Sequence, residues 1–385
     1  RSLGFILRPL GAFFFGAFAD TRGIKKSLLI SFMILGIATI LMGLLPPFAA
    51  IGVSASYLNV VLRLMQGFAL GGTYACSAVL SYQTSPAGKK GLYTAILQMS
   101  VPGGYLAALA MILVMKLVLG LDGFLNWGWR ICFLIVILFV PVYLRLRHTA
   151  IDPQDEKKPV RNFDDYSEEF RSFFATRLEF KKFFCFVLPL IAGMGTIAYI
   201  SNVWKLYFMQ SILKIDSASV SFIIAVSSVL YMPFYPVLGH LTDRLNRSKY
   251  MICAVACALL FMYPLFWLLA DWVEKNRGNI GNINVQTIVP IVLNTAISAV
   301  AILGYAPIIA FVCERVPRGI RCTLFAVSYN LGFGILSGIV HIVSGHYYEQ
   351  NKWIFAGLVF MEAVGIVSFI FAVLMRPKLP TKTFL

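Results

Sequence analysis

A carboxylate recurs at the ends of two apolar segments in this 385-residue sequence. Asp20 lies within Gly16-Ala-Phe-Ala-Asp-Thr-Arg-Gly-Ile-Lys-Lys26, and Asp243 follows 223 positions later (243 minus 20) within Gly239-His-Leu-Thr-Asp-Arg-Leu-Asn-Arg-Ser-Lys249. A carboxylate at a helix end can pair with a loop cation and hold neighbouring helices together, and breaking the pair releases them. A plain turn whose cations set topology is the alternative for one copy, and the second copy weakens it. The residues predicted to gate a conformational change are Gly16, Asp20, Gly23 and Lys25 in the first copy and Gly239, Asp243 and Arg244 in the second.

Cations inside the apolar segments are candidates for solute binding, because a charge in hydrocarbon costs on the order of 3 kcal/mol unless it faces a cavity or a partner. Arg63 lies one helical turn from Gln66 and could hold a carboxylate bidentately. An arginine that extends its head group to the membrane surface is the alternative. Arg8 precedes Pro9 and could bind a solute or the carbonyls that the proline leaves free.

An aromatic and amide-rich stretch adds further candidates. Trp and Tyr faces attract quaternary or protonated amines through cation–π contacts, although an interfacial aromatic belt explains the same residues. Together with the cations and with Asn330 in a later segment, the full set of predicted solute-binding residues is Arg8, Arg63, Gln66, Asn202, Trp204, Lys205, Tyr207 and Asn330.

Glu362 is the acid that lies well inside an apolar segment, so it is the candidate proton carrier. A hydrogen bond that packs two helices together is the alternative role. The sequence contains no nucleophile elbow, P-loop or HExxH motif, and its seven cysteines form no CxxC pair. We therefore predict no enzyme activity, no metal site and no cofactor.

The elements that position these residues are predicted to be membrane-spanning helices. Hydrophobic residues make up 59% of the sequence and charged residues 13%, against about 25% charged in soluble domains. Apolar runs recur along the whole chain, which indicates an all-α membrane protein with many spans. The expected spans are 3–19, 27–45, 57–82, 92–118, 127–147, 183–208, 217–239, 250–270, 287–313, 322–345 and 353–375.

The distribution of charge predicts orientation. Basic residues fill alternate loops, which places these loops and the C-terminus in the cytoplasm. The net charge of +16 therefore reflects membrane insertion rather than nucleic-acid binding. This orientation puts Arg1 on the outer side, and a missing first helix would give twelve spans.

Two related halves are predicted, joined by a polar segment. The domains expected are a helical bundle at 1–147, a cytoplasmic linker at 148–182, a six-helix bundle at 183–376 and a cytoplasmic tail at 377–385. Pro86 and Pro317 each precede a cation by four residues (Lys90 and Arg321), which supports an internal repeat. Within the linker, residues 164–182 could form an amphipathic surface helix with Phe170, Phe173, Phe174 and Leu178 on one face. A merely solvated linker is the alternative.

Three motifs carry a resemblance to a known family. They are the Gly16 to Lys26 loop, the preceding Leu7-Arg-Pro-Leu-Gly-Ala-Phe-Phe-Phe-Gly16, and Arg63-Leu-Met-Gln-Gly-Phe-Ala-Leu-Gly-Gly72. Together they resemble the major facilitator superfamily, specifically its metabolite:H⁺ symporter family and most of all the proline/betaine transporters. The resemblance implies two six-helix bundles around a central cavity. It also implies symport of a small organic solute with protons, or with another coupling cation, by alternating access across the lipid bilayer of the bacterial inner membrane.

The sequence departs from the family pattern at four positions. Thr21 and Ile24 replace loop arginines, Asn246 replaces a loop glycine, and Thr73 replaces a glutamate after the Gly-Gly pair. In the family that glutamate would couple transport to protons. The alternatives to a symporter are therefore an uncoupled facilitator or exchanger of organic acids such as α-ketoglutarate, or a truncated, non-functional relative. The motifs leave a zwitterion and a dicarboxylate both open as substrates.

Overall fold

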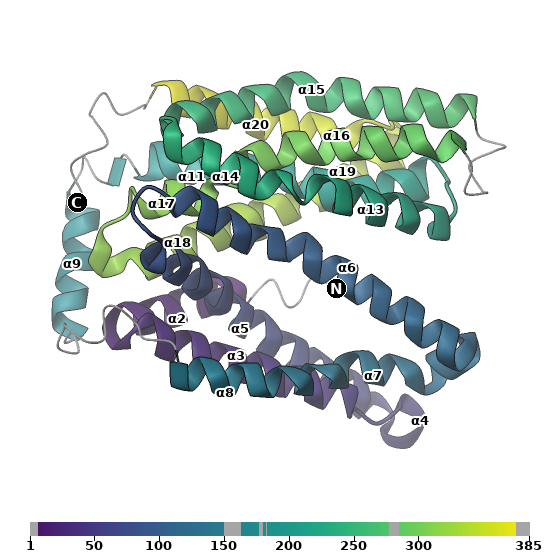
Figure 1. Cartoon of the computed structure of the whole chain (residues 1–385), viewed down its shortest axis with the longest axis horizontal. Helices are drawn as coiled ribbons and strands as arrows, with labels where there is room; N and C mark the ends of the chain where they lie inside the picture. Colours follow the sequence, from purple (N-terminus) through teal and green to yellow (C-terminus); the bar gives the residue numbers. More distant parts are fainter. Residues whose placement is uncertain (1–6, 150–162, 177–179, 182, 277–284, 375–385) are drawn as a thin grey trace. The chain divides into compact units, whose positions relative to one another are not determined.

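A computed structural model describes residues 7–149, 163–176, 180–181, 183–276 and 285–374. The regular elements in these ranges are all helices (Figure 1), which confirms the predicted all-α fold. Several long helices contain single π-helical or 3₁₀ turns, so that the segment from Phe183 to Ile212 is one continuous run of α and π turns.

Eight helices in the described part of the chain are long and apolar enough to cross a membrane. They are Ile24–Gly43, Lys90–His148, Phe183–Ile212, Ser217–Arg244, Arg247–Lys275, Ile288–Cys313, Arg318–Leu336 and Ala356–Leu374. The Lys90–His148 run has 59 residues and contains Gly120 at φ 70°, so the chain turns there between the expected spans 92–118 and 127–147. The expected spans 3–19 and 57–82 correspond to α2 (Arg8–Arg22) and α5 (Val53–Thr84), which are not among the eight. The count of eleven spans is therefore not confirmed.

The backbone contacts divide the chain into two compact units. Unit 1 contains residues 1–84, 104–175 and 316–330, and unit 2 contains residues 85–103, 176–315 and 331–385. Each unit therefore includes a short segment from the other half of the sequence. The predicted division into sequential bundles with a linker and a tail stays a prediction.

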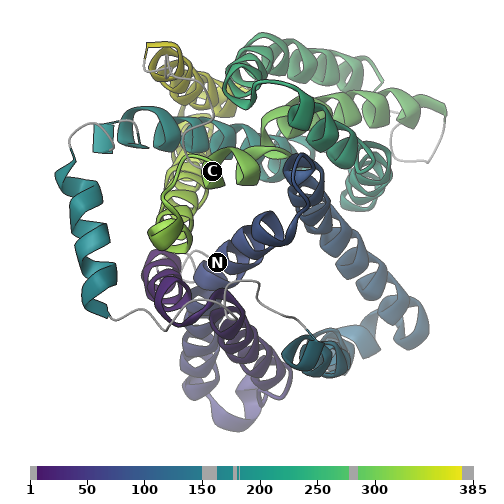
Figure 2. The same ribbon diagram turned by 60° about the vertical axis from the view of Figure 1, so that its left-hand side comes forward.

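Unit 1 is built around α2, α5, α3 (Ile24–Gly43) and α18 (Arg321–Tyr329). The purple helices α2 and α3 pack beside α5 (Figure 1, Figure 2), and α18 packs against α2 and α5. Buried Ala12 and Phe15 lie on the inner face of α2. The unit also holds the short helices α4 (Phe48–Ile51), α7 (Trp129–Leu134) and α8 (Val140–Thr149).

The predicted linker helix is present as α9 (Phe163–Ala175), which ends seven residues before the expected Lys182. Tyr166 and Phe173 are buried on its apolar face, and the helix packs against α2. Leu178, which was also expected on this face, lies outside the described residues.

Unit 2 contains the remaining long helices and the first turns of α6 (Lys90–Gly123). Its other helices are α11 (Leu188–Tyr199), α12 (Lys205–Tyr207), α13 (Ser217–Tyr231), α14 (Phe234–Arg244), α15 (Arg247–Lys275), α16 (Ile288–Tyr305), α17 (Ile308–Cys313), α19 (Ser337–Asn351) and α20 (Ala356–Leu374).

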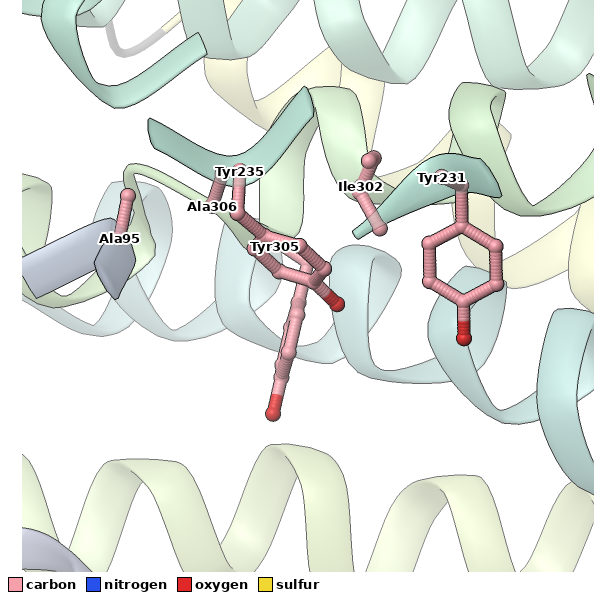
Figure 3. Packing of buried hydrophobic residues seen from close by; sticks show 6 residues of the cluster. All are labelled: Ala95, Tyr231, Tyr235, Ile302, Tyr305 and Ala306. Atoms are coloured by element: carbon pink, nitrogen blue, oxygen red, sulfur yellow. The ribbon is translucent and has the colours of Figure 1, made fainter. Parts of the chain in front are cut away.

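A buried cluster joins four of the helices in unit 2. Figure 3 shows Ala95 from α6 beside Tyr235 from α14 and Tyr305 from α16, with Tyr231 from α13 farther along. The rings of Tyr235 and Tyr305 meet edge to face with centroids 6.3 Å apart. Burial of these aromatic rings fixes the start of α6 against α14 and α16.

Candidate functional site

Asp20 binds the first turn of a helix that is distant in sequence. Its carboxylate accepts hydrogen bonds from the backbone N–H groups of Cys322 (3.0 Å) and Thr323 (2.9 Å). These are the second and third residues of α18, whose N–H groups have no partner within their own helix. A capping side chain normally precedes its own helix, whereas Asp20 comes from α2. We call this contact the first interhelical cap.

Asp243 makes the equivalent contact in unit 2. Its two oxygens accept hydrogen bonds from the backbone N–H groups of Gly91 (2.6 Å) and Leu92 (3.0 Å). These are again the second and third residues of a helix, in this case α6. We call this contact the second interhelical cap. The repeated loop aspartates thus cap helices at the same two positions, and each capped helix starts at the cation that follows its proline by four residues.

A glycine one turn before each aspartate lets the capped helix approach. A Cβ at Gly16 would lie 2.6 Å from Cα of Thr323, and a Cβ at Gly239 would lie 2.5 Å from the carbonyl oxygen of Gly91. Both neighbours are backbone atoms that cannot move without displacing the helix. Each cap therefore requires a glycine as well as an aspartate.

Hydroxyl groups surround the first cap. The Thr323 hydroxyl donates to Asp20 over 2.8 Å, and the Tyr166 hydroxyl of α9 lies 3.0 Å from the same Thr323 oxygen. Asp20 lies beyond the expected span 3–19. Burial raises the pKa of its carboxyl to about 7, and this effect outweighs the hydrogen bonds from Thr323 and Cys322 and the charge of Arg321, which lower the pKa. Burial likewise raises the pKa of Tyr166 to about 12. The expected partner of Asp20 was a loop cation; in the described part of the chain it binds helix N–H groups and a hydroxyl instead.

Charged groups surround the second cap. Arg247 forms ion pairs with Asp243, four residues earlier, and with Glu314. Arg315 lies 3.9 Å from Glu314, hydrogen-bonds Ser248 and donates to the carbonyl of Phe311 over 2.6 Å. A guanidinium that bridges two carboxylates orients both of them. Asp243 therefore does pair with a cation, as expected of a loop aspartate, but that cation is Arg247.

The other predicted gating residues frame these caps. Gly23 separates α2 from α3 at φ 103°, a backbone conformation that favours glycine. Lys25 lies in the first turn of α3 and is half-buried, and Arg244 ends α14 with an exposed side chain. Their roles in gating stay predictions.

The predicted solute-binding residues in unit 1 differ in burial. Arg63 is exposed and donates to Gln66 over 3.3 Å, and Gln66 in turn donates to Thr39 over 3.0 Å. Asn330 is buried and donates to the carbonyl of Gly71 over 3.3 Å, which joins the end of α18 to α5. Arg8 is half-buried in the first turn of α2.

In unit 2 the structure separates the predicted residues by burial. Lys205 is 2% exposed and donates to Ser298 of α16 over 2.7 Å, and Trp204 is fully buried against Gly357. Asn202 is exposed and donates back to its own helix, whereas Tyr207 is half-buried.

Glu362, the predicted proton carrier, is half-buried in α20.

Sequence reasoning missed Ser298, Thr323 and Gly91. A serine, a threonine or a glycine in an apolar segment carries no signal of its own; only the proline–cation spacing marked the starts of α6 and α18.

Comparisons with known proteins bear on the family and the fold of the chain. A family model described as Major Facilitator Superfamily matches residues 2–206 and 186–384, so it covers nearly the whole chain. The chain is similar in fold to the proton:xylose symporter XylE bound to 6-bromo-6-deoxy-D-glucose, with a TM-score of 0.73 at 15% identity over 99% of this chain and 86% of that one.

Curated relatives share about a quarter of their residues with this chain. The citrate-proton symporter of Klebsiella pneumoniae is 27% identical over 346 residues (89% of this chain, 73% of the relative). The alpha-ketoglutarate permease of Escherichia coli K12 is 27% identical over 269 residues (70% and 60%), so the matched region spans less than two thirds of that protein. The proline/betaine transporter of Escherichia coli K12 is 25% identical over 384 residues (97% and 73%).

Proposed function

Because this chain belongs to the Major Facilitator Superfamily, we propose that it moves a proline- or betaine-like solute together with protons by alternating access. The family and the relatives above are transporters of small solutes, and the chain is a multi-pass membrane protein. The observation that carries the proposal is the pair of interhelical caps, since each can form in one arrangement of the helices and break in another.

The caps would act as the conformational switch. Each joins a helix of one sequence half to the first turn of a helix from the other half. A side-chain cap contributes about 0.5–2 kcal/mol. Two such caps bias an equilibrium between capped and released arrangements by roughly a hundredfold. The binding free energy of a small solute is large enough to overcome a bias of this size.

In this proposal the protein lies in the bacterial inner membrane with the basic loops and the C-terminus in the cytoplasm. Both caps lie beside basic loops, so capping would close the cytoplasmic side. Gly16, Gly23, Lys25, Gly239 and Arg244 would support the caps.

A second function is favoured by one observation at Thr73. This residue replaces the glutamate to which proton coupling is ascribed in similar transporters, and its buried hydroxyl donates to the carbonyl of Ala69 over 2.8 Å. It therefore supplies no proton-binding group at this place. An uncoupled facilitator or exchanger of organic acids such as α-ketoglutarate is the corresponding alternative.

Uptake into proteoliposomes tests the proposal. The full chain is reconstituted and supplied with labelled proline, glycine betaine or α-ketoglutarate, with and without an inward proton gradient. Uptake of proline or glycine betaine that the gradient stimulates supports symport. Uptake that ignores the gradient supports the facilitator, and Thr73→Glu should then create pH dependence. Uptake of none of the three by the wild-type protein contradicts both.

A further inference from the structure

Unit 2 contains a buried amine without an acidic partner. Lys205 is 2% exposed, and its one hydrogen bond in the described structure goes to the hydroxyl of Ser298, 2.7 Å away. An ammonium group buried beside a hydroxyl alone loses its hydration without compensation. The same group paired with a carboxylate, or present as the neutral amine, avoids that loss.

A buried amide with unused hydrogen bonds lies one helical turn from Ser298 on α16. Asn294 is fully buried, and neither its side-chain oxygen nor its side-chain nitrogen has a partner among the described residues. Buried amides almost always have partners in folded proteins, so such an exception requires an explanation. A bound solute would supply the missing partners.

Helix geometry places Asn294 on the same face as Ser298. The two residues are four positions apart on α16, so they lie one turn apart on one face. That face continues to Ile302 and Tyr305, which belong to the cluster in Figure 3 against which Ala198 of α11 packs. Lys205 contacts Ser298, and Ala198, seven residues earlier, packs against the cluster that contains Tyr305, seven residues after Ser298. The two helical segments therefore run antiparallel. In this register Asn294 lies beside the turn that follows Lys205.

The surrounding helices leave the amine without a counter-charge. In the described residues no carboxylate lies within 4.0 Å of the Lys205 nitrogen. Away from the second cap, α15 carries the carboxyl groups of Asp271 and Glu274, and α20 carries that of Glu362. Helix α19 carries His346 and Glu349, and also His341, whose side chain lies outside the described part of the structure. Asp271 pairs with Lys275 and His346 with Gln350, and Glu349 is exposed. Glu362 is half-buried on α20.

We infer that Lys205, Ser298 and Asn294 bind the carboxylate of the transported solute, and that the coupling proton binds at the Lys205 amine rather than at Glu362. The inference rests on the proposed function and assigns one site to both solute and proton. The neutral amine takes up one proton to become an ammonium, which pairs with the carboxylate. On release, the solute and the proton both leave the site. Only the N–H bond forms and breaks, so one proton moves with each carboxylate. Ser298 and the Asn294 amide orient the carboxylate oxygens.

Binding to the purified full chain in lipid nanodiscs tests this site. Labelled glycine betaine and proline are titrated between pH 5.5 and 9, and proton uptake is followed with a pH indicator in weak buffer. In the wild type, affinity should fall about tenfold per pH unit once the amine loses its proton, because binding and protonation are linked. Lys205→Gln should weaken binding about 30-fold by removing the charge. Lys205→Arg keeps the charge at every pH, so it should bind without proton uptake and without pH dependence.

Two further variants complete the test. Lys214→Gln is the matched control, because Lys214 is an exposed lysine just beyond the end of the same helical run, and it should behave as wild type. Asn294→Ala should weaken binding about fivefold, since it removes hydrogen bonds to a charged group.

Three outcomes would overturn the inference. In the first, Lys205→Gln binds solute with wild-type affinity. In the second, Lys205→Arg still takes up protons as the wild type does. In the third, Glu362→Gln loses proton uptake while Lys205→Arg keeps normal proton uptake. In each case the wild-type protein still binds solute, so the proposed function survives. Failure of the wild type to bind either glycine betaine or proline contradicts the proposed function itself.

Discussion

The two interhelical caps share their geometry and differ in what supports them. Each uses an aspartate, a glycine one turn earlier, and the second and third N–H groups of the capped helix. The first is surrounded by the hydroxyls of Thr323 and Tyr166, whereas the second is tied into ion pairs with Arg247 and Glu314. The two caps thus share the groups that bind backbone and differ in the side chains that support them. We expect the first cap to respond to pH and the second to salt.

The largest effect should come from filling the close approach at either cap. Gly16→Leu and Gly239→Leu would force a side chain into backbone atoms of α18 and α6. Overpacking of this kind costs about 1–3 kcal/mol or more, so proteoliposome uptake should fall at least about tenfold. Gly36→Leu is the control, because a Cβ at Gly36 meets no atom within 4 Å. Equal loss in all three variants would show that uptake is sensitive to any leucine at a helical glycine.

Removing either aspartate should slow transport while leaving solute binding nearly unchanged. Asp20→Ala and Asp243→Ala each leave two helix N–H groups without an acceptor, which should lower the maximal uptake rate about tenfold. Asp216→Ala is the matched control, since Asp216 caps its own helix α13 through Ala218 and Ser219. If binding affinity fell as much as the uptake rate, the caps would belong to the binding site and not to the switch.

Substitution of Arg247 should reduce uptake by less, and it should distinguish Arg247 from Arg244, the other arginine near the second cap. Arg247→Gln removes both ion pairs but leaves the two N–H bonds of Asp243, so uptake should fall about threefold. High salt should lower wild-type uptake in the same direction, and it should act mainly on the Arg247–Glu314 pair, because the Glu314 side chain is 28% exposed whereas that of Asp243 is 2% exposed. Arg244→Gln changes an exposed side chain and should have no effect. A larger loss from Arg244→Gln would restore the gating role that its place in the motif predicts.

How far the sequence predicts these caps depends on which atoms make them. The aspartates and glycines are visible as side chains in a repeated pattern, so they could be identified in advance. Their partners are backbone N–H groups, which any residue supplies, and Cys322 lies 302 positions from Asp20. The proline–cation spacing marks where α6 and α18 begin, yet nothing in it tells which aspartate caps which helix.

The candidate solute site shows the same limit for buried charge. Hydropathy places both Arg63 and Lys205 inside apolar segments, but it does not tell which way either side chain points. Arg63 is exposed, whereas Lys205 is buried against Ser298. The turn at Gly120 lies where the sequence predicts the end of one span, whereas α2 and α5, which were expected to be spans, are not among the eight long apolar helices.

Loss of one hydroxyl should loosen the first cap slightly. Tyr166→Phe removes the contact between α9 and Thr323, so Cys322, which is buried beside the cap, should react with maleimide about two- to threefold faster. The measurement uses a chain in which Cys322 is the remaining cysteine. Tyr57→Phe is the control, because Tyr57 is 71% exposed. An unchanged rate in Tyr166→Phe would mean that α9 does not support the cap.

The smallest effect should be the pH response of the first cap. The pKa of Asp20 rises from 3.8 to about 7 where the carboxyl is buried, so protonation favours the capped arrangement. This contribution is complete below the ordinary pKa of an aspartate and is lost as the pH rises through about 7. We divide the maleimide reaction rate of Cys322 by its rate in Asp20→Ala, which corrects for ionisation of the thiol. This ratio should be higher at pH 8 than at pH 6, because the cap protects Cys322 less at the higher pH. A ratio that does not change with pH would show that burial of Asp20 does not make the first cap pH-sensitive, and the contrast with the second cap would then rest on salt alone.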